Sequence, residues 1–146
     1  NPQCPFVKFA HGSEGPLKSA AKKWREKDVV WIGINSGAPG KQGHGKAVNE
    51  AGKKGFGLDH AILLDEEGRV GRQYKAQRTP HVFVIDKAGK LVYRGAVDNS
   101  GGAPPDEEIE YVNYLERALD ATVAGKPVPD PVETRAWGCS VKYALK

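Results

Sequence analysis

Two short segments that lie far apart in the chain constrain its fold most strongly. The first, Asn1 to Lys8, contains a cysteine, Cys4, followed at once by a proline and an apolar stretch. Proline suits the first turn of a helix, because its missing N–H would be unpaired there in any case. Cys4 is therefore predicted at the start of a helix, where free backbone N–H groups and the positive end of the helix dipole favour the reactive thiolate.

The second segment, Arg78 to Asp86, ends in an apolar and β-branched stretch. A short stretch of this composition, closed by a charged residue, is typical of a buried strand. Thr79 and Pro80 stand at its entrance. We expect the two segments to meet in space and to form a thiol site.

Hydrophobic periodicity predicts the remaining elements of an α/β domain. Beyond a short helix that starts at Pro5, helices are expected over 16–26, 46–54, 69–74 and 106–123, and strands over 29–34, 61–65, 82–85 and 90–97. The proline-rich stretch 126–134 predicts an extended tail that wraps back over the domain and delivers Cys139.

Composition excludes several classes of protein. A chain of 146 residues can bury a normal core as one domain. Its two cysteines are too few for a disulfide scaffold or a cysteine-rich zinc site. The net charge of +4 is spread along the chain without a compact basic run, and no apolar stretch approaches the length of a membrane span. We therefore expect no nucleic-acid partner and no membrane partner.

The two segments and the tail together resemble the thioredoxin-like superfamily, in which a Cys-x-x-Cys motif opens a helix and faces a cis-proline loop. The resemblance extends to redoxins of the alkyl-hydroperoxide-reductase and thiol-specific-antioxidant type, at Cys4–Val7 (Cys-Pro-Phe-Val), Thr79–His81 (Thr-Pro-His) and Gly138–Lys142 (Gly-Cys-Ser-Val-Lys). It implies a single thioredoxin-like domain over 1–146, a three-layer α/β sandwich with a mixed sheet, no cofactor, and a cis bond before Pro80. From the residues alone, a trans proline at the first position of a strand fits equally well.

The chain departs from thioredoxin in two respects. Val7 replaces the second cysteine of Cys-x-x-Cys, so a disulfide within the chain must join Cys4 to Cys139. Thioredoxin-like domains also place strands before the active-site helix, whereas this sequence begins at Asn1. The resemblance therefore implies that N-terminal strands are missing, including one between 29–34 and 82–85.

The sequence has no methionine, so we expect a native chain that was truncated or processed at its N-terminus. A complementing chain or a dimer partner that supplies the missing strand is the alternative. A cleaved secretory signal would place the protein in the periplasm or outside the cell rather than in the cytoplasm, where oxidising conditions would allow Cys4 and Cys139 to pair.

Several residues are candidates for the chemistry. Cys4 is the expected nucleophile, and the backbone of Thr79, held open by a cis Pro80, could pair with an extended substrate strand. Cys139 is either a resolving thiol for Cys4 or one half of a structural disulfide, which could stabilise the fold by about 4–5 kcal/mol. Support could come from four further residues: His81 as base, Arg78 and Arg135 as cations beside a thiolate, and Asn35 from a loop at the end of a strand.

Three classes of function remain open. The first is a thiol-disulfide oxidoreductase that acts through Cys4. A thiol peroxidase with the same Cys4 belongs to this class, although Asn1 stands where peroxiredoxins carry threonine. The second is a copper-binding module in which Cys4, His81 and Cys139 hold Cu(I). The third is a redox-inert module that binds protein partners at the cis-proline groove.

Overall fold

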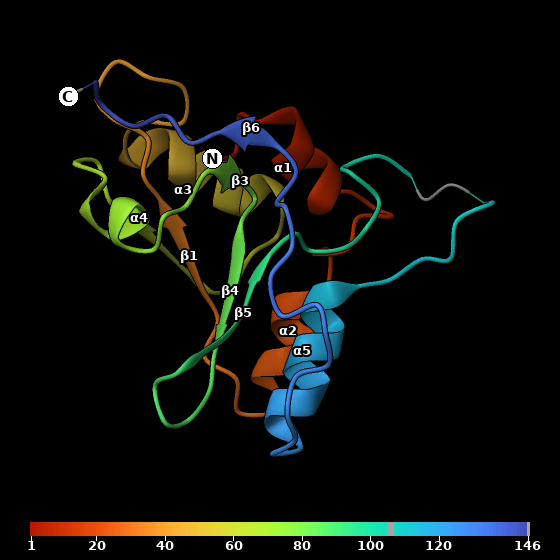
Figure 1. Cartoon of the computed structure of the whole chain (residues 1–146). Helices are drawn as coiled ribbons and strands as arrows, with labels where there is room; N and C mark the ends of the chain where they lie inside the picture. Colours follow the sequence, from red (N-terminus) through yellow and green to blue (C-terminus); the bar gives the residue numbers. More distant parts are fainter. Residues whose placement is uncertain (105–106, 146) are drawn as a thin grey trace.

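The strands in the described part of this protein lie in three separate pairs rather than in one continuous sheet. The computed structural model describes residues 1–104 and 107–145. One pair is parallel and two are antiparallel: β1 (Ile32–Asn35) with β2 (Ala61–Leu64), β4 (Val82–Ile85) with β5 (Leu91–Gly95), and β3 (Arg78–Thr79) with β6 (Cys139–Ser140). Together with the helices, these pairs confirm the predicted mixed α/β fold (Figure 1).

The described residues form five helices: α1 (Pro5–Ala10), α2 (Ala20–Arg25), α3 (Lys46–Gly55), α4 (Arg69–Gln73) and α5 (Tyr114–Val123). Helix α1 begins with Pro5, as the sequence predicts. Helices α2 and α5 lie side by side next to the β4–β5 pair (Figure 1). In the part of the chain that the structure describes, no helix has both the length and the apolar character needed to cross a bilayer.

The last helix is shorter than periodicity predicts. It starts at Tyr114 instead of 106, and the side chain of Asn113 caps it by accepting the Glu116 N–H at 2.9 Å. Residues just before it are engaged elsewhere: the Val112 N–H donates to the Asn99 side-chain oxygen, and the Val112 carbonyl accepts the Asn99 N–H. Those bonds replace helical ones. The predicted start at 106, and the loop end at 105, lie outside the described residues.

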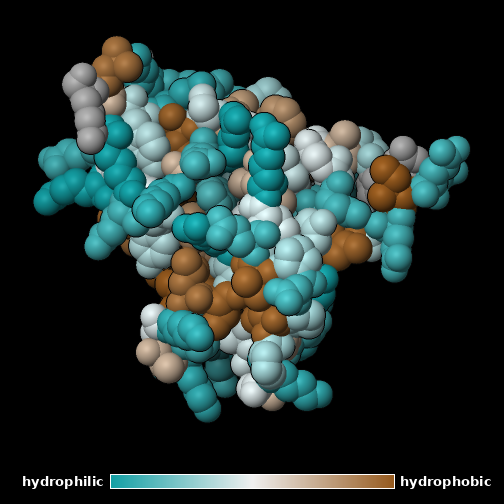
Figure 2. Space-filling model, in the orientation of Figure 1, coloured by the Kyte–Doolittle hydropathy of each residue, from teal (hydrophilic) through white to brown (hydrophobic). Residues whose placement is uncertain are grey.

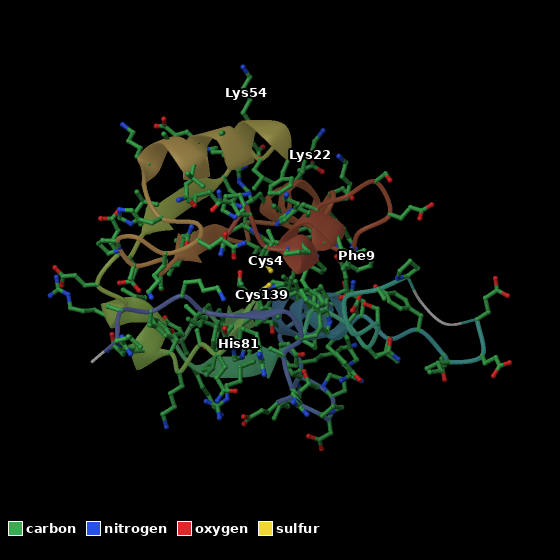
Figure 3. The ribbon with its side chains drawn as sticks, turned by 90° about the horizontal axis from the view of Figure 1, so that it is seen from above. Cys4, Phe9, Lys22, Lys54, His81 and Cys139 are labelled. Carbon is green, nitrogen blue, oxygen red and sulfur yellow. The ribbon has the colours of Figure 1, made fainter. Side chains whose placement is uncertain are left out.

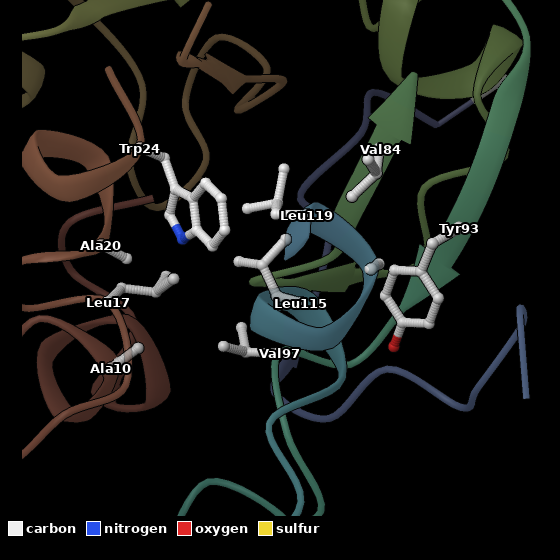
Figure 4. Packing of buried hydrophobic residues seen from close by; sticks show 10 residues of the cluster. Ala10, Leu17, Ala20, Trp24, Val84, Tyr93, Val97, Leu115 and Leu119 are labelled. Atoms are coloured by element: carbon white, nitrogen blue, oxygen red, sulfur yellow. The ribbon is translucent and has the colours of Figure 1, made fainter. Parts of the chain in front are cut away.

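The main core forms where α2 and α5 pack on the β4–β5 pair (Figure 4). It contains ten buried residues: Ala10, Leu17, Ala20, Trp24, Val84, Tyr93, Val97, Leu115, Ala118 and Leu119. The indole N–H of Trp24 donates to the Glu116 carboxylate at 2.8 Å. This hydrogen bond joins α2 to α5 and gives the indole N–H a partner. This half of the molecule is a normal hydrophobic core.

The other half is open between β1 and β4. Among the residues that the structure describes, β1 pairs only with β2 and β4 only with β5, and a cavity of about 1330 Å³ separates the two pairs. Large apolar side chains are left exposed along it, including Ile32 (51%), Ile34 (47%) and Ile85 (45%). Figure 2 shows hydrophobic surface gathered over this region. The predicted interruption of the sheet between these strands is therefore confirmed.

Leu115 provides a test of the core. It is 4% exposed in α5, whereas Val123 at the end of the same helix is 49% exposed. Leu115→Ala is expected to lower the free energy of unfolding by about 2–5 kcal/mol, because it removes buried methyl groups and leaves a cavity. Val123→Ala is the control and should change it by only about 0.5 kcal/mol. Denaturant unfolding of both variants measures the difference, and equal losses would contradict this description of the core.

Candidate thiol site

Cys4 occupies the position directly before α1. Its backbone is extended and its carbonyl accepts the Lys8 N–H at 3.0 Å, so it caps the first turn of the helix. The side chain is completely buried (0% exposed). Its Sγ lies 3.4 Å from the carbonyl oxygen of Thr79, which accepts the S–H of the protonated thiol. The two segments that the sequence predicts to meet are therefore in contact.

Thr79 contacts both cysteines. The peptide bond between Thr79 and Pro80 is cis. Strand β3 ends at Thr79 and pairs antiparallel with β6, so that Thr79 lies opposite Cys139 and Arg78 opposite Ser140. Both cysteines are free thiols, and Figure 3 shows their sulfur atoms next to one another, between α1 and the C-terminal tail.

Gly138 allows this close approach. Its φ of +120° is a conformation that other residues rarely adopt. A Cβ at this position would lie 2.3 Å from the Thr79 carbonyl oxygen and 2.8 Å from the Thr79 carbonyl carbon. Only glycine therefore lets β6 pair with β3 at this register.

Trp137 anchors the tail from the opposite direction. Its ring lies 6.4 Å from that of Phe6 and 6.3 Å from that of Phe9, both in α1. Its indole N–H donates to the backbone and side-chain oxygens of Asp98, each at 3.1 Å. Asp98 is 1% exposed and also accepts the hydroxyl of Tyr111 at 2.8 Å. The residue two positions before Cys139 is thus fixed to the helix that begins after Cys4.

Hydrogen bonds hold the tail beyond Cys139 as well. The Val141 N–H donates to the Gln77 carbonyl at 3.2 Å, and the Lys142 carbonyl accepts the Ala38 N–H at 2.9 Å. The Tyr143 hydroxyl donates to the Ala76 carbonyl at 2.9 Å, and the Arg72 guanidinium lies over the Tyr143 ring at 4.5 Å. We call residues 137–144 the tail strap, because they cross the thiol site and are bonded on both sides of it.

The two thiols differ in acidity. Burial opposes ionisation of Cys4, but hydrogen bonds from the Cys139 side chain and from the backbone of Val7, Cys139 and Phe6 outweigh it, so the pKa of Cys4 is lowered. Burial and the interaction with Cys4 raise the pKa of Cys139, against a smaller opposing effect of Lys142. Cys4 is therefore the more acidic thiol of the pair.

Two of the supporting residues predicted from sequence, His81 and Asn35, bond to groups other than the two thiols. His81 accepts the Gln77 N–H at Nδ1 (3.2 Å) and stacks on Phe83 with ring centroids 4.5 Å apart, and its burial lowers its pKa. Asn35 is buried and bonds to Asn49 at 2.6 Å and to Gly43 at 2.8 Å, so it braces a loop.

The two arginines lie on the segments that lead to the site. Arg78 is partly buried in β3, and Arg135 is exposed on the tail before β6. The alternative copper set of Cys4, His81 and Cys139 is not assembled: among the described residues, no three His, Cys, Asp or Glu side chains come close enough to hold a metal ion. The ring nitrogen of His81 is bonded to Gln77 instead.

Three contributors to the site were not predicted as functional: Trp137, Asp98 and Gly138. The sequence does contain a signal for two of them, because Trp137 and Gly138 directly precede Cys139. Asp98 has no such signal. Its role appears only when the loop after β5 folds onto the tail.

Comparison with known proteins agrees with this architecture. The Redoxin family model matches residues 3–114, and the chain belongs to the Redoxin family. An uncharacterized conserved protein from Geobacillus kaustophilus has the same fold, with a TM-score of 0.82 and 30% identity over 99% of this chain and 74% of its own. A hypothetical protein from Sinorhizobium meliloti 1021 matches with a TM-score of 0.79 and 25% identity, over 100% of this chain and 77% of its own. No curated protein matches significantly. The fold is thioredoxin-like and the family is of general oxidoreductase type.

The acidity of Cys4 has a measurable consequence. Because its pKa is lowered, the thiolate persists as the pH falls below the ordinary cysteine value of about 8.5 and is lost only on passing the lower pKa. Absorbance at 240 nm, which reports thiolate without needing access to the sulfur, should titrate with a midpoint below that value. Cys139→Ala should raise the midpoint, whereas Cys139→Ser keeps a hydroxyl donor and should raise it less. An ordinary midpoint in the native protein would contradict this assignment.

Gly138 can be tested against a matched glycine. Gly89 has a φ of +81° but open space around it, so Gly89→Ala carries the conformational penalty, of order 1–3 kcal/mol, without a clash. Gly138→Ala adds the clash with Thr79 and should destabilise more. Diamide should close a disulfide between Cys4 and Cys139 more slowly in Gly138→Ala than in Gly89→Ala. Equal closure rates would show that β6 does not depend on Gly138.

Proposed function

We propose that this protein is a thiol-disulfide oxidoreductase whose Cys4 and Cys139 alternate between a dithiol and an intrachain disulfide. The observation that carries the proposal is the β3–β6 pairing, which sets Cys139 opposite Thr79 while Cys4 contacts the same residue. Two sulfurs held together by the fold exchange far faster than two that must find each other. The lowered pKa of Cys4 supplies the thiolate that such exchange requires.

Closing or opening the disulfide between Cys4 and Cys139 transfers two electrons. The Cys4 thiolate attacks a Cys139 sulfur that carries a leaving thiol, the bond between Cys4 and Cys139 forms, and the leaving group departs as a thiolate. The reverse exchange with two external thiols restores the dithiol and joins those two thiols in a disulfide. The tail strap and α1 hold the two sulfurs in position. No metal or cofactor takes part in this scheme.

Turnover with a small disulfide tests the proposal. The reduced protein should accelerate exchange between hydroxyethyl disulfide and a thiol reductant. Mass mapping during the reaction should detect a Cys4–Cys139 disulfide. Cys4→Ser and Cys139→Ser should each lose most of the acceleration, because each removes one half of the couple. Gly89→Ala, remote from the thiols, is the control and should keep it.

Two results would contradict this function. A disulfide that resists reduction until the protein unfolds would identify the pair as a structural staple. Faster oxidation by hydroperoxide than by the disulfide, with a sulfenic acid on Cys4, would favour a thiol peroxidase of the same family instead.

A further inference from the structure

The two cysteines differ in access to solvent. Cys4 is 0% exposed, whereas Cys139 is partly exposed. Cys4 is enclosed by the start of α1, by Thr79 and by Cys139 itself. A molecule that approaches the site from solvent therefore meets Cys139 before it meets Cys4.

The edge of β3 is also occupied. A bare strand edge beside Pro80 could add an extended polypeptide through its backbone groups. Here β6 already pairs with Arg78 and Thr79, and the Val141 N–H continues the pairing to Gln77. The tail strap thus takes the position that an extended polypeptide substrate would need. Small molecules do not require that edge.

We propose that a low-molecular-weight thiol, or its disulfide, exchanges with this protein at Cys139. Cys4 is the buried partner: its sulfur is the leaving group when the Cys4–Cys139 disulfide is reduced and the attacking group when that disulfide forms. This inference rests on the proposed dithiol–disulfide function and deepens it, because it names the entry point and the class of partner. It reverses the order of roles that the sequence suggests, in which Cys4 attacks first and Cys139 resolves.

The reductive direction follows from access and acidity together. An incoming thiolate attacks Cys139 Sγ, a mixed disulfide forms on Cys139, and the Cys4–Cys139 bond breaks with its electron pair on Cys4. The sulfur with the lower pKa is the better leaving group, and that sulfur is Cys4. A second thiolate then attacks the mixed disulfide, releases the small disulfide, and leaves Cys139 to take up a proton. The positive charge of Lys142 beside Cys139 favours the incoming thiolate.

The oxidative direction uses the same order. Cys139 attacks the small disulfide while its proton passes to the Cys4 thiolate to which it is hydrogen-bonded. One small thiolate leaves, and a mixed disulfide remains on Cys139. Cys4 then passes its proton to the small thiolate that left first, attacks Cys139 Sγ and releases the second small thiol as its thiolate, which solvent protonates. One disulfide is consumed, one is formed, and two small thiols are produced.

Single-cysteine variants with glutathione disulfide as the probe test this order. Cys4→Ser leaves the outer thiol and should form a mixed disulfide at least about tenfold faster than Cys139→Ser, even though Cys4 is the more acidic sulfur. Faster reaction of Cys139→Ser would overturn the inference, because it would show that external disulfides reach Cys4 directly.

Loosening the tail strap provides the matched control. Tyr143→Ala removes the bond to Ala76 and the contact with Arg72, and in the Cys139→Ser background it should speed the reaction of Cys4. An unchanged rate would show that the strap does not protect Cys4.

Peptide mapping of the wild-type chain provides a test that does not depend on whether the variants fold. The oxidised protein is treated briefly with glutathione and quenched with N-ethylmaleimide, and peptide masses should place glutathione on Cys139 and the maleimide on Cys4. Glutathione on Cys4 would overturn the inference. These experiments measure access rather than turnover, so the order of roles can fail while the dithiol–disulfide cycle still holds.

Discussion

The short pairing between β3 and β6 is the contact on which the thiol site depends. It joins only two residues of each strand, yet it brings Cys139 to Thr79, the residue whose carbonyl also contacts Cys4. The pairing requires glycine at 138, because any side chain there would strike Thr79. Trp137 on one side and Val141 on the other fix the register. A site usually formed by cysteines close in sequence is formed here by residues from opposite ends of the chain.

Burial and hydrogen bonding divide the work between the two sulfurs. Cys4 is enclosed, and its pKa is lowered because Cys139 and backbone N–H groups stabilise the thiolate more than burial disfavours it. Cys139 keeps contact with solvent, and its pKa is raised because partial burial and the neighbouring Cys4 both disfavour its ionisation. Cys4 is therefore the more acidic thiol and Cys139 the more accessible one, and the proposed thiol-disulfide exchange requires both properties. The cavity between β1 and β4 reaches this site, because Val7, Thr79 and Pro80 line it, whereas Cys4 itself stays buried.

Sequence reasoning identified the parts of the site that depend on local chemistry. Pro5 predicted the helix start at Cys4, and the apolar stretch after Pro80 predicted β4, because both signals come from neighbours in sequence. The β3–β6 pairing could not be found this way, since two-residue strands have no periodicity. The sequence also could not predict which way the His81 side chain points, because alternation along a strand does not say which face meets the thiols. Val112 suited a helix by spacing, but it bonds to Asn99 instead, and the helix begins only after its cap, Asn113.

The central claim is that the folded chain holds Cys4 and Cys139 ready to bond. The effective concentration of one thiol toward the other, measured by equilibrating the protein with glutathione and its disulfide, tests this most directly. If the fold brings the sulfurs together, the effective concentration in native conditions should exceed that in denaturant by at least about tenfold, since the unfolded chain separates its two ends. Equal values in native and denatured protein would contradict the account, because they would mean that the fold does nothing to join the two cysteines.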